Sequence, residues 1–188
     1  GFSTVGWMSR THAPLALLVA LTLALTGCGG VGKGLGKAGP SPAPTAAFAS
    51  EEEALAAAVA VYDRFNEISD EVGQSGGHDA ERLGEVLVGE FLDASVEGYR
   101  GWAEKGWRQV GATSFRDASL QQYSAGPSAA VIIYICDDVT GADVVDSGGQ
   151  SIVPADRVDI NYFQVTFDLA EDGRLLVAAR QRWDERTC

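Results

Sequence analysis

Proton transfer by a protein needs a carboxylate, a histidine or a phenol held beside the substrate. The sequence contains only two histidines, His12 near the start and His78 in a Gly-rich loop, which argues against a His–Asp pair and most zinc sites. It also lacks a Gly-rich phosphate loop, a nucleophile elbow and a cysteine cluster, so we expect no metal and no cofactor. The remaining candidates are carboxylates and tyrosines: Asp63, Asp159, Tyr62, Tyr134 and Tyr162.

Asp63 is the carboxylate that an enzyme would use, because it follows Tyr62 on a predicted helix. Neighbouring helix positions differ by about 100°, so Asp63 lies beside the apolar face and not on it. It is either a general base that works with a pocket tyrosine, or a helix residue that is solvated or paired with a sheet arginine such as Arg180 or Arg182. The second interpretation is favoured. Asp159 alternates with apolar neighbours and is expected to face outward.

Aromatic side chains suggest a different activity, the binding of an apolar ligand in a pocket. Several of them gather where a predicted helix gives way to strands, and others are spread through the predicted sheet. The candidate ligand-binding residues are Tyr62, Tyr99, Trp102, Tyr134 and Tyr162. The alternative for any single one is an ordinary place in the core or at its rim.

Cys28 stands at the end of a short apolar segment, residues 15–25, that follows the positive charge of Arg10. This segment is shorter than the about twenty residues that span a bilayer. A basic start, a short apolar run and small residues before a cysteine resemble the signal of bacterial lipoproteins. The resemblance implies that residues 1–27 are removed, with residues 1–7 an upstream extension from a misplaced start. It also implies that the Cys28 thiol carries a diacylglyceryl group, so the chain is held on the outer face of the cell membrane.

Cys136 and Cys188 remain once Cys28 is assigned to lipid. Outside the cytoplasm, such a pair normally forms a disulfide, which here would fasten the C-terminus to a predicted strand. The alternative is a free catalytic or metal-binding thiol. That role needs a nearby base or cation, and histidine is almost absent.

The formal net charge is −12 over 188 residues, and the acidic residues are scattered along the chain. Nucleic-acid binding is not expected, because it depends on cationic surfaces. Residues 28–49 are rich in Gly, Ala, Pro and Ser and are predicted to form a flexible tether. Residues 50–188 suffice for one folded domain. The sequence gives no prediction of oligomeric state.

The folded domain is predicted to begin with a helix capped by Ser50 and Glu53, a capping-box pair. Apolar residues then recur at spacings of three and four until Gly73. A second helical region, from 79 to about 105, contains three glycines, so two helices or one kinked helix are expected.

Beyond Trp107 the apolar period changes to two, which predicts strands over about 110–123, 129–137, 158–169 and 175–183. A shorter strand over 142–146 is expected to form a hairpin with 150–153. The phase of apolar residues changes near Tyr162, which predicts a β-bulge or bend there.

The order of these elements resembles the nuclear transport factor 2-like superfamily, which includes ketosteroid isomerase-like enzymes. The resemblance is carried by residues 60–63 (AVYD), 131–138 (VIIYICDD), 171–174 (EDGR) and 186–188 (RTC). It implies an α+β fold, with N-terminal helices packed on a strongly bent, mostly antiparallel four-stranded sheet. In that family the sheet and helices form a cone that encloses a pocket. The family includes enzymes, transport adaptors and inhibitors, so the resemblance does not decide the function.

We therefore expect a lipid-anchored binding or accessory protein that recognises a small apolar ligand or a protein of the cell envelope. The alternative is a proton-transfer enzyme of the isomerase or dehydratase type that uses Asp63 with a pocket tyrosine. An open cone would favour a ligand, and a filled cone would favour a protein partner.

Overall fold

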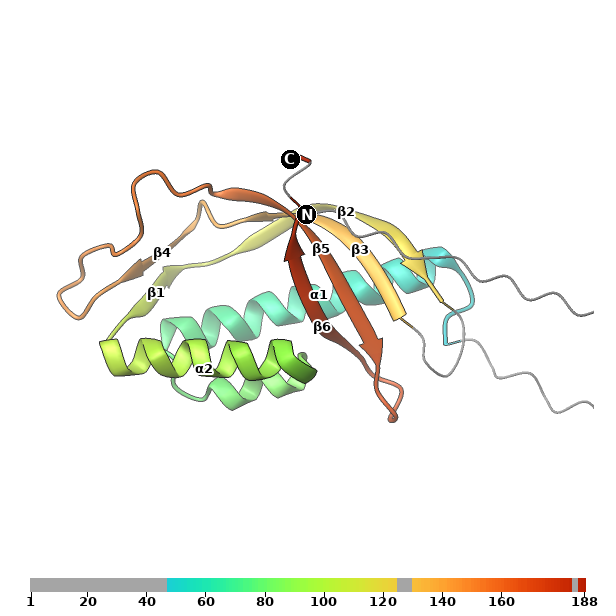
Figure 1. Cartoon of the computed structure of the whole chain (residues 1–188), viewed down its shortest axis with the longest axis horizontal. Coiled ribbons are helices and arrows are strands. Elements are labelled where there is room, and N and C mark those ends of the chain that lie inside the picture. Colours follow the sequence, from blue (N-terminus) through green and yellow to red (C-terminus); the bar gives the residue numbers. More distant parts are fainter. Residues whose placement is uncertain (1–46, 125–129, 184–185) are drawn as a thin grey trace, which may run out of the picture. The chain divides into compact units, whose positions relative to one another are not determined.

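The computed structural model describes residues 47–124, 130–183 and 186–188. Two helices and a short 3₁₀ helix pack on one face of a bent antiparallel sheet (Figure 1). The α+β fold class predicted from the sequence is confirmed. The predicted signal peptide, the Cys28 lipidation site and most of the tether lie outside the described residues. Within the described part of the chain, no helix combines the length and apolar character needed to cross a membrane.

Helix α1 spans Glu51–Gln74 and starts as the capping box predicted. The backbone N–H of Glu53 donates to the Ser50 hydroxyl at 3.2 Å, and the Ala49 N–H donates to the Glu53 carboxylate at 2.6 Å. Phe48 is buried and its ring lies 6.3 Å from that of Tyr123. The packed domain therefore already includes Phe48, which falls within the predicted tether.

The second helical region consists of two segments, as the glycines indicated. The 3₁₀ helix η1 spans Ala80–Glu85, and α2 spans Gly89–Lys105. Between them, Leu87 forms a parallel bridge with Val177 of the sheet. The loop that precedes η1 approaches α2 closely at Gly77, where an added Cβ would lie 2.0 Å from the Tyr99 carbonyl oxygen. Only glycine fits there, so the α1–η1 turn can lie against α2.

The main sheet has the strand order β2-β3-β5-β6, and a separate ribbon pairs β1 with β4. The strands are β1 Arg108–Gly111, β2 Ser114–Tyr123, β3 Ala130–Asp138, β4 Ala142–Val145, β5 Ile160–Leu169 and β6 Leu175–Arg182. The strand predicted over 110–123 is thus divided, with a break at 112–113.

The predicted hairpin of 142–146 with 150–153 is present as a short one, with an antiparallel bridge between Val145 and Ser151. The Asp146 N–H donates to the Gln150 carbonyl and the Ile152 N–H to the Val144 carbonyl, both at 2.9 Å. The other edge of β4 pairs with β1.

The bulge predicted near Tyr162 is not there, since the β3–β5 register runs without interruption through that residue. The prediction of a bulge rests on Val158 and Ile160 being core residues. Both are exposed, so their position in the alternation does not show which side of the strand faces the core. The register instead shifts twice on β2, between Arg116 and Ser119 and between Leu120 and Gln122. It shifts once between β5 and β6, where Ala178 is the extra residue opposite the Thr166–Phe167 step.

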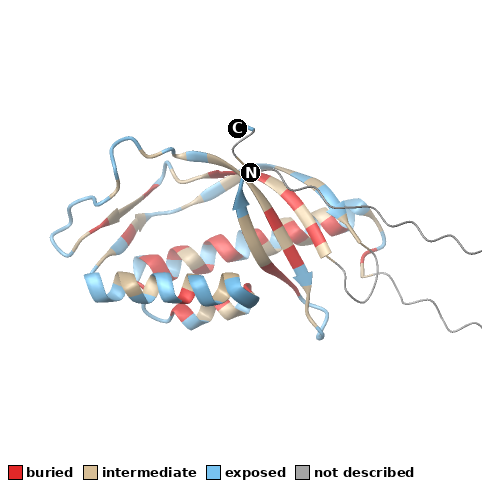
Figure 2. Ribbon diagram, viewed as in Figure 1, coloured by how far each residue is buried: buried red, intermediate tan, exposed pale blue. Residues whose placement is uncertain are grey.

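The two faces of the sheet differ in what covers them, and alternation along β3 defines both (Figure 2). The inner face packs on α1 and carries Val131, Ile133, Ile135 and Asp137, all buried. The outer face carries the intervening residues, among them Tyr134 and Cys136.

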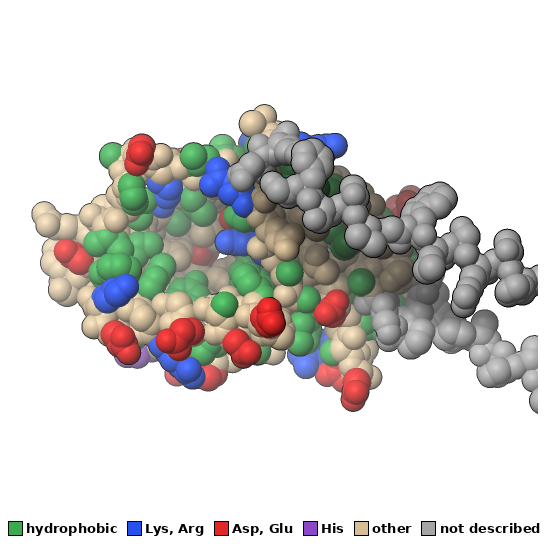
Figure 3. All heavy atoms as spheres, in the orientation of Figure 1, with side chains coloured by type: hydrophobic (Ala, Val, Ile, Leu, Met, Phe, Trp, Pro, Cys, Tyr) green, Lys and Arg blue, Asp and Glu red, His purple; other side chains and the backbone are tan. Residues whose placement is uncertain are grey.

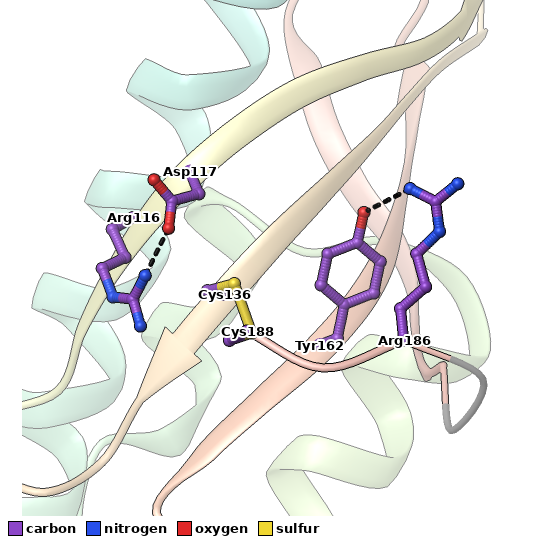
Figure 4. Close-up of a disulfide and its surroundings, with 6 residues drawn as sticks. All are labelled: Arg116, Asp117, Cys136, Tyr162, Arg186 and Cys188. Atoms are coloured by element: carbon purple, nitrogen blue, oxygen red, sulfur yellow. Dashed lines mark hydrogen bonds and ion pairs between the residues drawn. A yellow bond between two sulfur atoms is a disulfide. The ribbon is translucent and has the colours of Figure 1, made fainter.

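The predicted disulfide lies on the outer face of the sheet and joins Cys136 of β3 to Cys188, with a Cα–Cα distance of 5.7 Å (Figure 4). Tyr134 and Tyr162 stack there at 5.4 Å, and Trp183 meets Tyr134 edge-on at 5.7 Å. The Arg186 guanidinium lies about 6 Å from both tyrosine rings. The last residues of the chain are thus fastened over the sheet by covalent and ring contacts.

Candidate functional site

A cavity of about 290 Å³ lies between α1, α2 and the inner face of the sheet. The space-filling view shows the hollow between α2 and the sheet, with hydrophobic side chains along it (Figure 3). Its lining is Phe65, Asn66, Ser69 and Asp70 of α1, Phe91, Ser95, Gly98, Tyr99 and Trp102 of α2, then Gln109, Thr113, Asp137, Val139 and Arg180. Aromatic rings and polar groups therefore share one small space.

Helix α1 supplies a polar line within its buried face. Tyr62, Asn66 and Asp70 follow one another at four-residue spacing, so they lie on one side of the helix, and all three are buried. Tyr62 contacts a strand residue, Asp137 of β3, whereas Asn66 and Asp70 line the cavity.

Tyr62 forms a buried cluster with Asp137 of β3 and Arg180 of β6. The Tyr62 hydroxyl donates to Asp137 Oδ1 at 3.1 Å, and Arg180 Nη1 donates to the Tyr62 hydroxyl at 3.2 Å and to Asp137 Oδ2 at 3.4 Å. The Asp137 side chain is 5% exposed and that of Arg180 is 29% exposed. The Arg180 guanidinium also lies 4.4 Å from the Phe163 ring centre.

Burial dominates the electrostatics of this cluster. It raises the pKa of the Asp137 carboxyl above its usual range, although Arg180 and the Tyr62 hydroxyl favour the charged form. Burial likewise raises the pKa of the Tyr62 hydroxyl, so this phenol stays protonated at neutral pH. The Asp137 carboxyl therefore holds a proton more readily than an exposed aspartate does, and Tyr62 and Arg180 fix its orientation.

Asp70 is the second buried carboxylate that lines the cavity, and its hydrogen bonds are satisfied. Gln109 Nε2 donates to it at 2.6 Å, while the Thr113 backbone N–H and hydroxyl each donate at 3.0 Å. Gln109 can reach this position because it lies against Gly73, where an added Cβ would be 2.7 Å from its Oε1. Asp70 thus joins α1 to the segment around β1.

Two buried polar atoms in the cavity lining have no hydrogen-bond partner, Asn66 Nδ2 and Ser69 Oγ. The carbonyl of Ser69 accepts a hydrogen bond from the Tyr99 hydroxyl at 3.1 Å, and burial raises the pKa of that phenol. Unpartnered buried polar groups are uncommon in folded proteins and call for an explanation.

The structure brings together only some of the residues predicted from the sequence. Tyr99 and Trp102 line the cavity, with their rings 5.2 Å apart. Tyr62 lies next to it, with its hydroxyl engaged by Asp137 and Arg180. Tyr134 and Tyr162 stack on the outer face and do not line the cavity.

The carboxylates foreseen from the sequence also lie elsewhere. Asp63 is exposed and does not line the cavity, and Asp159 forms an ion pair with Arg157 at 2.7 Å. Arg180, one of the two arginines considered as a partner for Asp63, pairs with Asp137. The carboxylate beside Tyr62 is therefore Asp137 and not Asp63.

Sequence reasoning missed Asn66, Ser69, Asp70, Asp137 and Arg180 as cavity residues. A signal for Asp137 was present, because it continues the alternation of Val131, Ile133 and Ile135 onto the buried face. The described residues contain no group of three or more His, Cys, Asp or Glu side chains placed to hold a metal ion.

Comparison with known proteins adds information about the fold alone. No protein-family profile and no curated protein sequence matches the chain. The intermembrane-space region of the chloroplast protein ARC6 is similar in structure, with a TM-score of 0.50 and 14% identity over 68% of this chain and 95% of that one. Aln2 from a Streptomyces species has a TM-score of 0.41 and 15% identity over 72% and 92%. A Catenulispora acidiphila protein in complex with S-DNPA has a TM-score of 0.40 and 14% identity over 68% and 92%.

Proposed function

We propose that the domain binds a small, mainly apolar molecule in the cavity between α1, α2 and the sheet. The observation that carries this proposal is a cavity of about 290 Å³ beside the hydrophobic core, lined by aromatic and polar side chains. Ligand pockets of proteins run from about 300 to 1,000 Å³ and are mostly apolar with a few placed polar groups. Phe65, Phe91, Tyr99 and Trp102 supply the apolar lining.

An unfilled cavity favours a small ligand over the envelope protein that was the other expectation. On the outer face, where a protein could dock, the rings of Tyr134 and Tyr162 stack on one another and Cys136 is bonded to the C-terminal cysteine. A protein partner has no comparable observation in its support.

The ligand proposal is tested by filling the cavity from α2. Gly98 lines the cavity and an added Cβ there would meet no atom within 4 Å, so Gly98→Leu places a side chain in free space. Gly101→Leu is the matched control, since Gly101 has the same freedom on the same helix but does not line the cavity.

Native mass spectrometry of the protein purified from its own cells is the measurement. We expect a bound small molecule on the wild type and on Gly101→Leu, and its loss on Gly98→Leu. A wild-type protein that carries no ligand and binds none from a cell extract would contradict the proposal.

A proton-transfer enzyme is a second candidate, favoured by one observation, the raised pKa of the Asp137 carboxyl at the cavity wall. Both of its oxygens are engaged, by Tyr62 and by Arg180, which favours a structural role. Turnover of an enolisable substrate that is lost in Asp137→Asn but retained in Asp63→Asn would establish the enzyme.

We also propose that the chain is anchored to the outer face of the cell membrane by a lipid on Cys28. The support is the sequence pattern around that residue, a short apolar run that ends in small residues and a cysteine. The tether predicted from Cys28 would then end close to the packed residue Phe48. In detergent phase partitioning, the Cys28→Ser protein should be found in the aqueous phase. A variant that still enters the detergent phase would contradict the proposal.

A further inference from the structure

The cavity has hydrogen-bonding capacity that the protein does not use, and this capacity lies on α1. Asn66 and Ser69 are three residues apart, so they lie on the same side of the helix. Asn66 is 7% exposed, and neither its Nδ2 nor the Ser69 Oγ has a partner. A buried hydrogen-bond donor without an acceptor destabilises the folded protein, and a ligand that supplies the acceptor removes this penalty.

The two carboxylates that line the cavity are already engaged, whereas the Asn66 amide nitrogen has no partner. Asp70 is held by Gln109 and Thr113, and Asp137 is held by Tyr62 and Arg180. Asn66 and Ser69 both line the cavity, so each can donate a hydrogen bond to a molecule bound there. The ligand atom that fits between them is a hydrogen-bond acceptor.

The charges around the cavity disfavour ligands of either sign. Asp70 and Asp137 repel an anion, and the one cationic group of the lining, Arg180, is committed to Asp137 and Tyr62. A cation would meet the Arg180 charge and the donor hydrogens of Asn66, and the oxygens of both carboxylates are already engaged by other donors. Moving a charged ligand from water into this small space adds a desolvation penalty in both cases.

The aromatic lining favours a flat molecule. Phe65 and Phe91 lie 5.9 Å apart and tilted, while Tyr99 and Trp102 meet edge-on at 5.2 Å. Rings arranged in this way present faces and edges to a planar guest.

We propose that this cavity selects uncharged, planar molecules that carry a hydrogen-bond acceptor, with Asn66 as the residue that recognises the acceptor. This inference rests on the proposed function and refines it, because it states which class of small molecule the cavity takes. Ser69 is the secondary donor, and the four aromatic residues hold the ring system.

Four probes with one ring system test the selectivity: 2-acetylnaphthalene, naphthalene, 2-naphthoate and trimethyl(2-naphthylmethyl)ammonium. Each is titrated into the full chain in phospholipid nanodiscs, with empty discs as the blank, and the dissociation constant is measured by calorimetry. The variants are Asn66→Leu, the cavity-filled Gly98→Leu, and Gln164→Leu as a control that removes an amide from the outer face.

We expect 2-acetylnaphthalene to bind about threefold to tenfold more tightly than naphthalene, the range for one added hydrogen bond. Naphthoate and the ammonium probe should bind more weakly than the ketone. Asn66→Leu should remove the advantage of the ketone over naphthalene without weakening naphthalene itself, and Gln164→Leu should retain that advantage.

The outcomes separate this inference from the proposed function. Equal affinity for the ketone and naphthalene, tighter binding of either charged probe, or an unchanged preference in Asn66→Leu would overturn the inference. Provided that Gly98→Leu weakens naphthalene, the cavity would still be a ligand site. If no probe binds the wild type, or if Gly98→Leu has no effect on any of them, the proposed function fails as well. A circular dichroism melt of Asn66→Leu, expected to match the wild type closely, verifies that the variant is folded.

Discussion

The inner and outer faces of the same sheet are built in opposite ways. On the outer face, a disulfide and a set of ring contacts join Cys136, Tyr134 and Tyr162 to the last residues of the chain. On the inner face, an unfilled cavity borders a buried charged cluster and two polar atoms without partners. Adjacent residues of β3 lie on opposite faces of the sheet. The disulfide-bonded outer face and the cavity on the inner face are therefore separated only by the thickness of this strand. We infer that the outer face stabilises the fold, whereas the inner face provides the binding site.

The largest effect should come from the outer face, when the bridge is removed in Cys136→Ala with Cys188→Ala. The bridge closes a loop with a sequence separation of 52, for which chain entropy predicts a loss of about 4 kcal/mol in the free energy of unfolding. Urea denaturation without reductant is the measurement, and probe binding at the cavity should persist below the transition. An unchanged denaturation midpoint would refute a structural role for the bridge.

Breaking the inner cluster should have the next largest effect, and it should depend on pH. Arg180→Met leaves Asp137 buried without its cation, which at neutral pH should lower the free energy of unfolding by about 3 kcal/mol. Burial already raises the pKa of Asp137, and loss of Arg180 raises it further. The folded variant therefore keeps a proton that the unfolded chain, with an aspartate pKa near 4, releases, so stability falls as pH rises.

The destabilisation by Arg180→Met should therefore shrink as the pH is lowered from 7 toward about 4. Adding Asp137→Leu should restore much of the loss at neutral pH, because no unpaired charge then remains buried. Denaturation curves at several pH values measure both effects. A loss of stability that does not vary with pH would mean that Arg180 acts through packing alone.

A smaller effect is expected from Tyr134→Leu on the outer face, which keeps apolar bulk and removes the stacking on Tyr162 and Trp183. The free energy of unfolding should fall by about 1 kcal/mol, with no change in the affinity for naphthalene. Trp102→Leu, on the cavity side, should instead weaken that affinity. If Tyr134→Leu weakens binding as strongly as Trp102→Leu, the two faces are not functionally distinct.

The smallest effect should come from Asp63→Asn, because Asp63 is exposed and lies outside the cavity. Its free energy of unfolding should change by less than about 0.5 kcal/mol, and probe binding should not change. Thermal melts and one naphthalene titration suffice. A large loss of binding would return Asp63 to the list of site residues.

The elements of this fold were predictable where a local pattern is enough to specify them. The capping box at Ser50 and the glycine-interrupted second helical region were both found, since caps and breakers act within a few residues. The Cys136–Cys188 bridge was also predicted, because only one pair remained. Tyr99 and Trp102 were proposed as pocket residues from their position at the helix-to-strand junction, and both line the cavity. Their role in ligand binding stays a prediction.

The inner cluster was harder to foresee, because it depends on strand pairing. In an uninterrupted strand, Val177 and Ala179 would share a face and Arg180 would point the other way. The extra residue Ala178 shifts this phase, so Arg180 comes to lie opposite Val165 and beside Asp137. Bulges of this kind follow from pairing between strands and have no local sequence signal comparable to a helix cap.

The two register shifts on β2 have a consequence for how copies of this domain behave beside one another. β2 is an edge strand, with unpaired backbone groups along one side that could template a strand from a neighbouring molecule. Asp117 adopts a left-handed backbone with φ of 57°, and the charged side chains of Arg116 and Asp117 pair at the same position. A regular ladder cannot extend across such an interruption. The β2 edge is thereby protected against pairing with a strand of a neighbouring molecule.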